Sequence, residues 1–379
     1  MTATTAKKRS FPIGTSILVV LIVIGLAVAI YRFAYGLGAV TNLSDGRAWG
    51  LWISFDLYTG VPLAAGGFTI AATVYIFNLK KYYPIVRSAI LTAFLGYLMV
   101  IFALLVDVGQ PWRLWHILIY WNLHSPLFEV GWCVILYTAV LALEFSPVVF
   151  ERFNLDVPLQ VIRTYQIPLV IIGIVLSTLH QSSLGSMFLM MDYSLNPLWY
   201  TPIIQLLFLL SAISVGLAMT IVESTLSAKG LGHEVSQDVL AGLGRAIPYI
   251  LGLYLVVKLG DVLVAGELGL AFSGTLQSIL WLVEIIGGVI APIVLLAMPS
   301  VRQSRNKLFW SAVLVVLGLV LNRFNVSLLG LAPRPGTVYF PHWMEFAISI
   351  AVVSGGVLAY MLANKYLPVA HHEAAAKAH

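Results

Sequence analysis

Ten stretches of roughly 20 apolar residues follow one another along this chain, each long enough to cross a membrane as a helix. Hydrophobic residues make up 60% of the 379 residues, charged residues only 10%, and the mean hydropathy is +0.94. Soluble domains carry about 25% charged residues, so a single water-soluble core is excluded. The expected spans are 13–35, 54–77, 88–106, 125–146, 165–190, 202–226, 246–264, 276–298, 308–329 and 343–363.

The sequence therefore predicts an all-α integral membrane protein with about ten transmembrane helices. The first apolar stretch follows a basic segment, as in a signal peptide, but no small-residue cleavage site comes after it, so we interpret it as the first helix. We expect a cytoplasmic N-terminus over 1–12, a membrane domain over 13–363 and a cytoplasmic tail over 364–379.

A weak internal repeat favours two four-helix bundles. Asp107 and Glu129 are 22 residues apart on the third and fourth helices, and Asp261 and Glu284 are 23 apart on the seventh and eighth. Equivalent bundles of helices 2–5 and 6–9, flanked by helices 1 and 10, account for both pairs.

The distribution of lysine and arginine predicts the orientation, because cytoplasmic loops carry an excess of both. With a cytoplasmic N-terminus, all but six of the 21 basic residues lie on the inner side; the six are Arg32, Arg47, Arg113, Lys258, Arg323 and Arg334. We therefore expect both termini in the cytoplasm and the chain in a bacterial inner membrane. The net charge of +5 reflects these residues at helix ends, so it does not indicate nucleic-acid binding.

Ionisable side chains inside the spans are the candidate functional residues. At the bilayer centre each costs at least about 2.5–3.5 kcal/mol, so each needs a partner or a function. Only Glu144 and Glu223 lie clearly on the inner side. The others gather in the outer half of the expected bundle: Asp56, Asp107, Glu129, His180, Lys258, Asp261, Glu284, Arg323, His342 and Glu345.

Several of these residues also have structural interpretations. Lys258 and Asp261 are three residues apart on one helix, close enough to form an ion pair, and a carboxylate is expected to neutralise Arg323. His180 shares a stripe with Ser183, which suits an interhelical hydrogen bond between closely packed helices. Asp107 and Glu129, by contrast, have no basic neighbour three or four residues away in their own helices.

The available ligands limit the redox cofactors. Haem b in a membrane bundle usually needs two histidines at matching depth, and only His180 lies well inside a span. The single cysteine, Cys133, cannot hold an iron–sulfur cluster. We therefore expect no haem, cluster or metal ion in this chain, and an exchangeable quinone as the electron carrier. Donors and proton-transferring groups for it would be His180, Asp107, Glu129, Asp56 and Ser183.

Motifs spread over nearly the whole chain resemble one family. They are Phe33–Gly38, Trp49–Asp56, Val106–Gly109, Leu127–Glu129, Ala142–Pro147, His180–Ser186, Asn196–Trp199, Leu270–Gly274 and Tyr339–Pro341. Together they are similar to the NrfD/polysulfide-reductase family of quinone-interacting membrane subunits. Within it, the likeness is greatest to the membrane subunit of hydrogenase-2-type periplasmic [NiFe]-hydrogenases.

This resemblance implies a haem-free subunit that exchanges electrons between a periplasmic iron–sulfur protein and menaquinone near the periplasmic face. The implied partners are a four-cluster ferredoxin-like subunit and the small and large hydrogenase subunits, in contact with membrane lipid. The family is also linked with proton movement, for which Glu284, Glu223 and Glu144 are candidate waypoints.

Other interpretations stay open. The chain could serve a polysulfide- or cytochrome-linked complex of the same family. An ion-coupled secondary transporter is a further alternative, although matched helices broken near mid-membrane are not evident. Between the third and fourth spans, an aromatic segment suits either the membrane surface or a docking platform or ligand entrance; its residues are Trp112, Trp115, Tyr120 and Trp121.

Overall fold

The computed structural model describes residues 13–47, 49–190, 194–232, 235–331 and 339–369. Within these residues ten helices are long and apolar enough to cross a membrane, and no β-strand occurs, only an isolated bridge between Leu195 and Leu331. The predicted all-α membrane fold is confirmed. The predicted segment 1–12 and most of the predicted tail lie outside the described residues.

Most spans are single α-helices: α1 (Ile13–Tyr35), α4 (Val86–Asp107), α5 (Pro126–Phe153), α7 (Gln166–Leu189), α8 (Ile204–Leu231), α9 (Gln237–Val264) and α14 (Trp343–Tyr366). The other three are segmented. The second span comprises η2 (Trp52–Leu57), α2 (Gly60–Leu63), α3 (Gly66–Ala71) and η3 (Ala72–Ile76). The eighth comprises α10 (Leu276–Val283), η7 (Glu284–Ile290) and α11 (Ala291–Ala297), and the ninth α13 (Arg305–Phe324) and η8 (Asn325–Leu329). Short helices in the connections are η1 (Leu37–Ala39), η4 (Lys80–Ile85), η5 (Pro111–Leu118), α6 (Asp156–Thr164), η6 (Leu268–Phe272) and α12 (Pro299–Arg302).

Several helices extend further than their apolar stretches. The stretch 125–146 becomes α5, which continues to Phe153, and the stretch 246–264 becomes α9, which begins at Gln237. The added turns carry charged residues such as Glu151 and Arg245, which lower hydropathy without breaking a helix. Hydropathy thus locates the apolar core of each span rather than its helical ends.

Four segments within the spans are π-helical, namely η2, η3, η7 and η8. Such turns are rare and occur frequently at functional sites. Three of them contain a buried polar side chain: Asp56 in η2, Glu284 in η7 and Asn325 in η8. Because the residues before and after each π-helical segment are apolar, a hydropathy profile does not distinguish these segments from the rest of the span.

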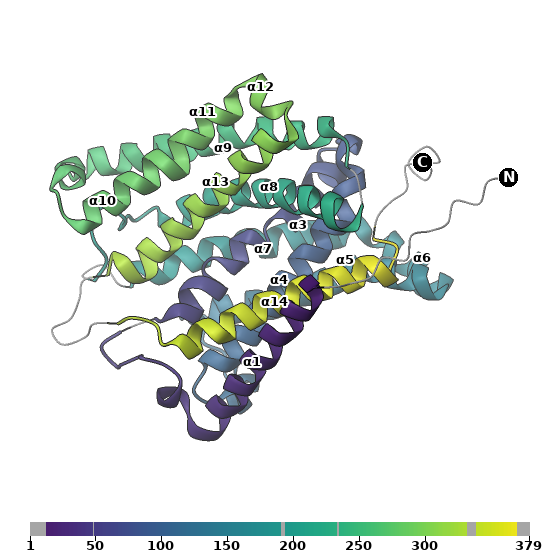
Figure 1. Ribbon diagram of the computed structural model, residues 1–379, viewed down its shortest axis with the longest axis horizontal. Helices are drawn as coiled ribbons and strands as arrows, with labels where there is room; N and C mark the ends of the chain where they lie inside the picture. Colours follow the sequence, from purple (N-terminus) through teal and green to yellow (C-terminus); the bar gives the residue numbers. More distant parts are fainter. Residues whose placement is uncertain (1–12, 48, 191–193, 233–234, 332–338, 370–379) are drawn as a thin grey trace.

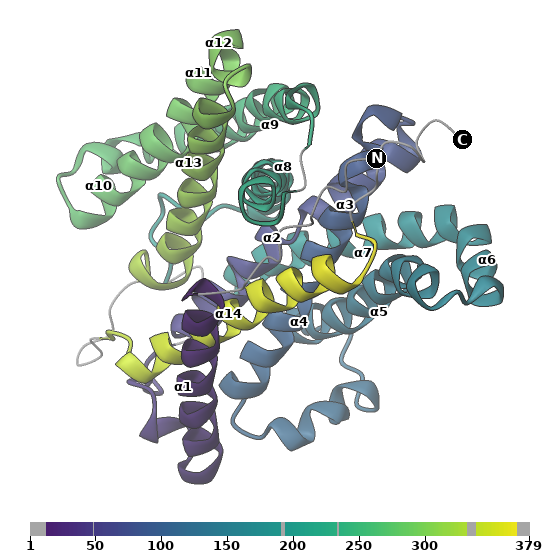
Figure 2. The same cartoon turned by 45° about the vertical axis from the view of Figure 1, so that its right-hand side comes forward.

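The molecule has two ends, set by the direction of its helices. The terminal end is where α1 begins and α14 ends, and the distal end is the opposite one, with the connections 36–51, 108–125 and 265–275. In Figure 1 the terminal end lies toward the right, and α9–α13 lie above α4, α5, α14 and α1. Figure 2 shows α8 nearly end-on between these two groups.

Helix contacts divide into neighbourhoods around α8. On one side α3, α4, α5 and α7 pack in succession, and on the other α9, α11, η7 and α13 do so. The helix pair α1 and α14 packs outside the first group, mainly through α14 against α4. These neighbours are compatible with two four-helix bundles, which remains our interpretation.

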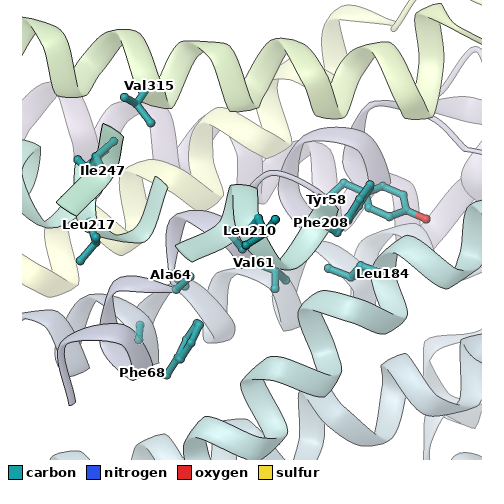
Figure 3. Packing of buried hydrophobic residues seen from close by; sticks show 14 of the residues in the cluster. Tyr58, Val61, Ala64, Phe68, Leu184, Phe208, Leu210, Leu217, Ile247 and Val315 are labelled. Atoms are coloured by element: carbon teal, nitrogen blue, oxygen red, sulfur yellow. The ribbon is translucent and has the colours of Figure 1, made fainter. Parts of the chain in front are cut away.

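The apolar core runs continuously through both groups. Figure 3 shows Phe208, Leu210 and Leu217 of α8 between residues of the two sides, with Val61 and Ala64 on the first side and Ile247 and Val315 on the second. Glycines bring backbones together at two crossings. A Cβ at Gly216 of α8 would lie 2.7 Å from the Gly66 nitrogen, and one at Gly288 would lie 2.6 Å from the Gly318 Cα. Small residues at such crossings are typical of membrane helices.

Candidate functional site

Three carboxyl groups lie near one another at the distal end, where α4 and α14 pack against η2. Asp56 of η2 is buried and accepts a hydrogen bond from Ser349 Oγ of α14 at 2.6 Å. Asp107, the last residue of α4, is close enough to Asp56 and to Glu345 of α14 for their charges to interact. We call this set the distal cluster; it comprises Arg32, Asp56, Asp107, Tyr339, Glu345 and Ser349.

Arg32 supplies positive charge to this cluster. Its guanidinium is buried and donates from Nε to the Val106 carbonyl oxygen at 2.6 Å and from Nη2 to the Val108 carbonyl oxygen at 2.5 Å. These carbonyls belong to the C-terminal end of α4, where a cation is favoured by the helix dipole. Arg32 therefore links α1 to α4, and it is also within electrostatic range of the Asp107 carboxyl group.

Glu345 is the most heavily bonded member of the distal cluster. Its Oε1 accepts from the backbone nitrogens of Asn42 and His342 at 3.1 and 2.8 Å, and its Oε2 accepts from the Tyr339 hydroxyl at 2.5 Å. The bonds with His342 form a capping box at the start of α14. Burial and the neighbouring Glu345 raise the pKa of Tyr339, so this hydroxyl keeps its proton and stays a donor.

The carboxyl groups of the distal cluster thus differ in their surroundings. Glu345 accepts hydrogen bonds from three donors, and the Arg32 guanidinium lies at the end of α4. The Asp56 side chain, by contrast, has one hydrogen-bond donor, Ser349, among the described residues. A buried carboxyl group with few donors beside one with many is an arrangement able to accept and release a proton. Asp56 and Asp107 are the members suited to that exchange.

His180 lies apart from these residues. It is fully buried on α7, and its ring centroid is 5.6 Å from that of Tyr97 on α4, which in turn is 4.7 Å from that of Tyr137 on α5. Both imidazole nitrogens and both tyrosine hydroxyls lack a hydrogen-bond partner among the described residues. Tyr97 precedes Asp107 by ten residues of α4, or about 15 Å at 1.5 Å per residue. The structure therefore brings Asp56 and Asp107 within electrostatic range of each other, but it places His180 in the interior of its own span, α7.

Two more residues of the expected quinone site also lie elsewhere. Glu129 is exposed in the first turn of α5, where the helix dipole favours a carboxylate. The Ser183 hydroxyl donates to the His180 carbonyl oxygen of its own helix at 3.2 Å. A hydropathy profile gives the depth of a residue but not the direction in which it faces, which is why the sequence groups these five residues.

The aromatic segment before α5 is exposed at the distal end. The side chains of Trp112, Trp115, Tyr120 and Trp121 are each more than half accessible, and Trp132 Nε1 of α5 donates to the Ile117 carbonyl oxygen beneath them at 3.1 Å. Figure 2 shows this connection extending away from the helices between α4 and α5. Its position agrees with either interpretation, a membrane-surface segment or a docking platform.

A second polar cluster lies in the other helical group, and we call it the Glu284 cluster. Glu284 Oε1 accepts from Asn322 Nδ2 at 2.8 Å, and Oε2 accepts from Trp199 Nε1 at 2.8 Å and from Asn325 Nδ2 at 2.7 Å. Arg323 Nη1 donates to Asn322 Oδ1 at 2.5 Å, so the Asn322 amide lies between the guanidinium and the carboxylate. Arg323 also lies over the Phe208 ring at 3.7 Å and donates to Ser211 Oγ at 2.8 Å.

The ion pairs expected from the sequence are not direct contacts. Lys258 Nζ donates to the Leu198 carbonyl oxygen at 2.7 Å, and Asp261 accepts from Thr201 Oγ1 at 2.7 Å. In the described part of the chain, salt bridges join only Arg87 and Arg163 to Glu151. Lys258, Asp261 and Arg323 therefore meet the cost of burial mostly through neutral partners, while Lys258 stays within electrostatic range of Asp261 and Glu284.

The two inner carboxyl groups occupy different settings. Glu223 of α8 accepts from Thr92 Oγ1 of α4 at 2.6 Å and from the Tyr360 hydroxyl of α14 at 2.8 Å, so it joins three helices. Glu144 of α5 is half-buried beside Gly173 of α7. Among the described residues, neither is hydrogen-bonded to the distal cluster or to the Glu284 cluster.

Metal ligands are scarce in the same residues. No group of three or more histidine, cysteine, aspartate or glutamate side chains suited to a metal ion occurs in the described part of the chain. His180 is the one histidine within its membrane-spanning helices. A haem with two histidine ligands does not fit this set of residues.

Comparison with known proteins assigns the family. The model for "Polysulphide reductase, NrfD" matches residues 39–332. The chain belongs to the NrfD family. It is 40% identical over 378 residues to a protein of Nitratidesulfovibrio vulgaris, covering 97% of this chain and 96% of that protein. It is 35% identical over 354 residues to the "Probable Ni/Fe-hydrogenase 2 b-type cytochrome subunit" of Escherichia coli K12, covering 92% and 90% of the two chains. With the "Menaquinone reductase, integral membrane subunit" of Nitratidesulfovibrio vulgaris the identity is 31% over 378 residues, covering 92% and 90%.

The family and the ten spans make this chain a multi-pass membrane protein related to membrane subunits of quinone-linked redox complexes. Several residues of its polar clusters are hard to recognise from sequence. Glu345 stands out there only as a helix start, although the pattern His342-x-x-Glu345 signals a cap. Arg32 counts there only as a basic residue on the outer side. Asn322 and Asn325 carry no signal, because a neutral polar residue in an apolar helix is common.

Proposed function

We propose that this chain is the quinone-reactive membrane subunit of a respiratory complex. It exchanges electrons between an iron–sulfur partner at the distal end and menaquinone bound near the distal cluster. The observation that carries the proposal is the gathering of Asp56, Asp107 and Glu345 at one end of a membrane bundle, with Arg32 within electrostatic range of Asp107. The printed names of two relatives, a menaquinone reductase subunit and a hydrogenase subunit, support the choice of substrate and of partner class.

The chemistry of quinone reduction explains why carboxyl groups are needed. Two electrons from the partner and two protons convert a quinone into a quinol, and each proton needs a donor within hydrogen-bond reach. Asp56 and Asp107 are proposed as the exchanging groups, with Tyr339 as a fixed hydrogen-bond donor. Arg32 stabilises the ionised state of Asp107 after its proton has left. His180 is too deep to join Asp107 in one contact, so we assign it to proton transfer within the first helical group.

The proposed protein partners bind at the same end of the molecule, the distal end. We propose a four-cluster ferredoxin-like subunit at the distal end, followed by the small and large subunits of an uptake [NiFe]-hydrogenase. The exposed aromatic segment that contains Trp112 and Trp115 is the proposed contact region. In this proposal the terminal end faces the cytoplasm of a bacterium and the distal end faces the periplasm, as the basic residues predict.

Proton movement across the membrane is proposed as a second role. Glu284 lies eight residues from the distal start of its span, about 12 Å deep, and Glu223 and Glu144 lie toward the terminal end. Each is at least partly buried, which suits a group that changes protonation rather than one that anchors a surface. The route between them passes through helix interiors.

Haem is not part of the proposal for this chain. The hydrogenase relative has "b-type cytochrome" in its name, but the described residues offer His180 as the one histidine within the spans. Bis-histidine ligation needs two on facing helices. The electrons are therefore proposed to pass from the partner's clusters to the quinone directly.

The experiment uses the complex purified from membranes with its native partners. Asp107→Asn and Asp56→Asn are each compared with Asp45→Asn, a carboxyl group outside the cluster at the same distal end. We expect substrate-dependent reduction of a menaquinone analogue to fall about 100-fold or more in the first two and to stay unchanged in the third. Reduction of an artificial dye by the partner subunits persists in all three, which separates loss of quinone chemistry from loss of assembly. Full quinone activity in both distal-cluster variants would refute the proposed site, and a complex without iron–sulfur signals or extractable quinone would refute the function.

A further inference from the structure

The Glu284 cluster contains two small cavities, and Tyr254 of α9 lines both of them. The polar lining of the first consists of Ser211, Tyr254, Glu284 and Asn322. The second has as its polar lining Trp199, Tyr254, Lys258, Asn322 and Arg323. Both are about the size that a single water molecule needs, so a quinone or a large anion does not fit.

Polar groups around the second cavity have unused hydrogen-bonding capacity. Arg323 Nε is buried and has no hydrogen-bond partner among the described residues. Lys258 is 2% exposed, and its ammonium group, which has three N–H donors, donates to one carbonyl oxygen, that of Leu198. An unsatisfied buried donor costs about 1–3 kcal/mol, and more when it is charged. Water bound in a polar cavity removes that cost.

The first cavity has a matching acceptor. An ionised carboxylate has about four lone-pair sites, and three of those of Glu284 are filled by Asn322, Trp199 and Asn325. Two of these donors share Oε2, so the free site is on Oε1. Since Glu284 lines the first cavity, a water molecule there can donate to that oxygen.

Two polar side chains line both cavities: Asn322, whose amide is already bonded to Glu284 and Arg323, and Tyr254. Tyr254 lies one helical turn from Lys258 on α9, so the two side chains occupy the same face. It is also within electrostatic range of Glu284 and of Arg323. A phenolic hydroxyl both donates and accepts, and thus can bond to a water on each side.

We propose that each cavity binds one water molecule and that the two waters join Lys258 to Glu284 through the Tyr254 hydroxyl. Lys258 Nζ donates to the water in the second cavity, and that water donates to Tyr254 Oη. Tyr254 Oη donates in turn to the water in the first cavity, and that water donates to Glu284 Oε1. When every bridging proton shifts by one bond, Lys258 becomes a neutral amine and Glu284 a carboxylic acid. Tyr254 and both waters are regenerated, and the total charge of the cluster is unchanged.

Arg323 affects both ends of this shift. It is a permanent cation held beside the cluster by Asn322 and Ser211, and it disfavours a second positive charge on Lys258. The same cation also interacts favourably with the carboxylate of Glu284, so its effects on the two ends oppose each other. The water sites stand independently of the quinone chemistry; only their use in coupled proton movement rests on the proposed function.

The first test is a high-resolution cryo-electron microscopy structure of the intact complex in lipid nanodiscs. We expect density for one water in each cavity, within hydrogen-bond distance of Tyr254 Oη, and loss of at least one of them in Tyr254→Phe. Tyr249→Phe is the matched control, because it alters an exposed tyrosine of the same helix and leaves both waters in place. Empty cavities in a map that resolves other ordered waters would overturn the proposal.

The second test measures proton movement during quinone reduction by the complex in proteoliposomes. Tyr254→Phe is expected to reduce the protons moved per electron by at least half, with quinone reduction unchanged, and Tyr249→Phe is expected to change neither. Waters in both cavities with unaltered proton movement in Tyr254→Phe would overturn the link through Tyr254. Loss of quinone reduction by distal-cluster variants alone concerns the proposed function and leaves the water sites intact.

Discussion

The bond between Trp199 and Glu284 allows the charge of a buried carboxyl group to be measured. Trp199 Nε1 donates to Glu284 Oε2 at 2.8 Å, and both side chains are at most 2% exposed. Hydrogen bonds between membrane helices average about 0.6 kcal/mol and reach about 1.7 kcal/mol, and bonds to charged groups are worth about 1.5–3 kcal/mol. Three N–H donors on one carboxyl group match an ionised acceptor, so we expect a coupling energy of about 1.5 kcal/mol.

A double-mutant cycle of Trp199→Phe and Glu284→Gln measures this coupling. Loss of the indole area occurs in both backgrounds and cancels, so the remaining free energy belongs to the bond. The assay is unfolding of the purified subunit by sodium dodecyl sulfate in mixed micelles, followed by intrinsic fluorescence. Trp132→Phe is the control, because Trp132 donates to a backbone carbonyl in the other helical group and should show no coupling to Glu284→Gln. A Trp199–Glu284 coupling below about 0.5 kcal/mol, typical of neutral partners, would refute the ionised state and with it the direction of the proposed proton shift.

Three further outcomes are expected. Gly216→Ala should lower the free energy of unfolding by about 2 kcal/mol through overpacking, since its Cβ would meet the backbone of α3. As a control, a Cβ at Gly230 of the same helix meets nothing within 4 Å, so Gly230→Ala should be neutral or stabilising by up to about 1 kcal/mol. Equal effects of the two substitutions would contradict the tight crossing. In intact cells an impermeant maleimide should label a cysteine placed at Gln110, at the distal end, and not one at Gln160 of α6; the reverse pattern would invert the orientation. A pyridine haemochrome spectrum of the isolated subunit should contain no haem b, and one haem per chain would require a ligand other than a histidine pair.

How far the sequence predicts the fold can be judged from the spans. Apolar length locates the ten spans found among the described residues, because a helix in lipid must satisfy its own backbone and present apolar side chains. The helical ends are less predictable, since Glu151 and Lys229 lie on turns that continue beyond the apolar core. The π-helical turns of η2 and η7 are not predictable, because they change the rotation of a helix without changing its composition.

For the polar sites, depth is predictable and rotation is not. Asp56 and Asp107 are expected at the same level near the outer face, and they lie within electrostatic range of each other. Glu129 is expected at that level too, but its side chain is exposed in the first turn of α5. Lys258 and Asp261 have the spacing of an ion pair, but each finds a neutral partner in the 194–203 segment, namely Leu198 and Thr201. Tertiary neighbours, which one helix does not specify, decide these outcomes.

The pairing of α1 with α14 means that the first helix to enter the membrane finds its partner last. More than 300 residues separate the two helices in sequence, and at about 5–20 residues per second their synthesis takes roughly 15–60 s. During that time Arg32 and Asp56 are already in the membrane without Glu345 and Ser349, which arrive with α14. Insertion of the last helix is therefore also the step that assembles the distal cluster, and a chain truncated before α14 would be a substrate for quality-control proteolysis rather than a partly active subunit.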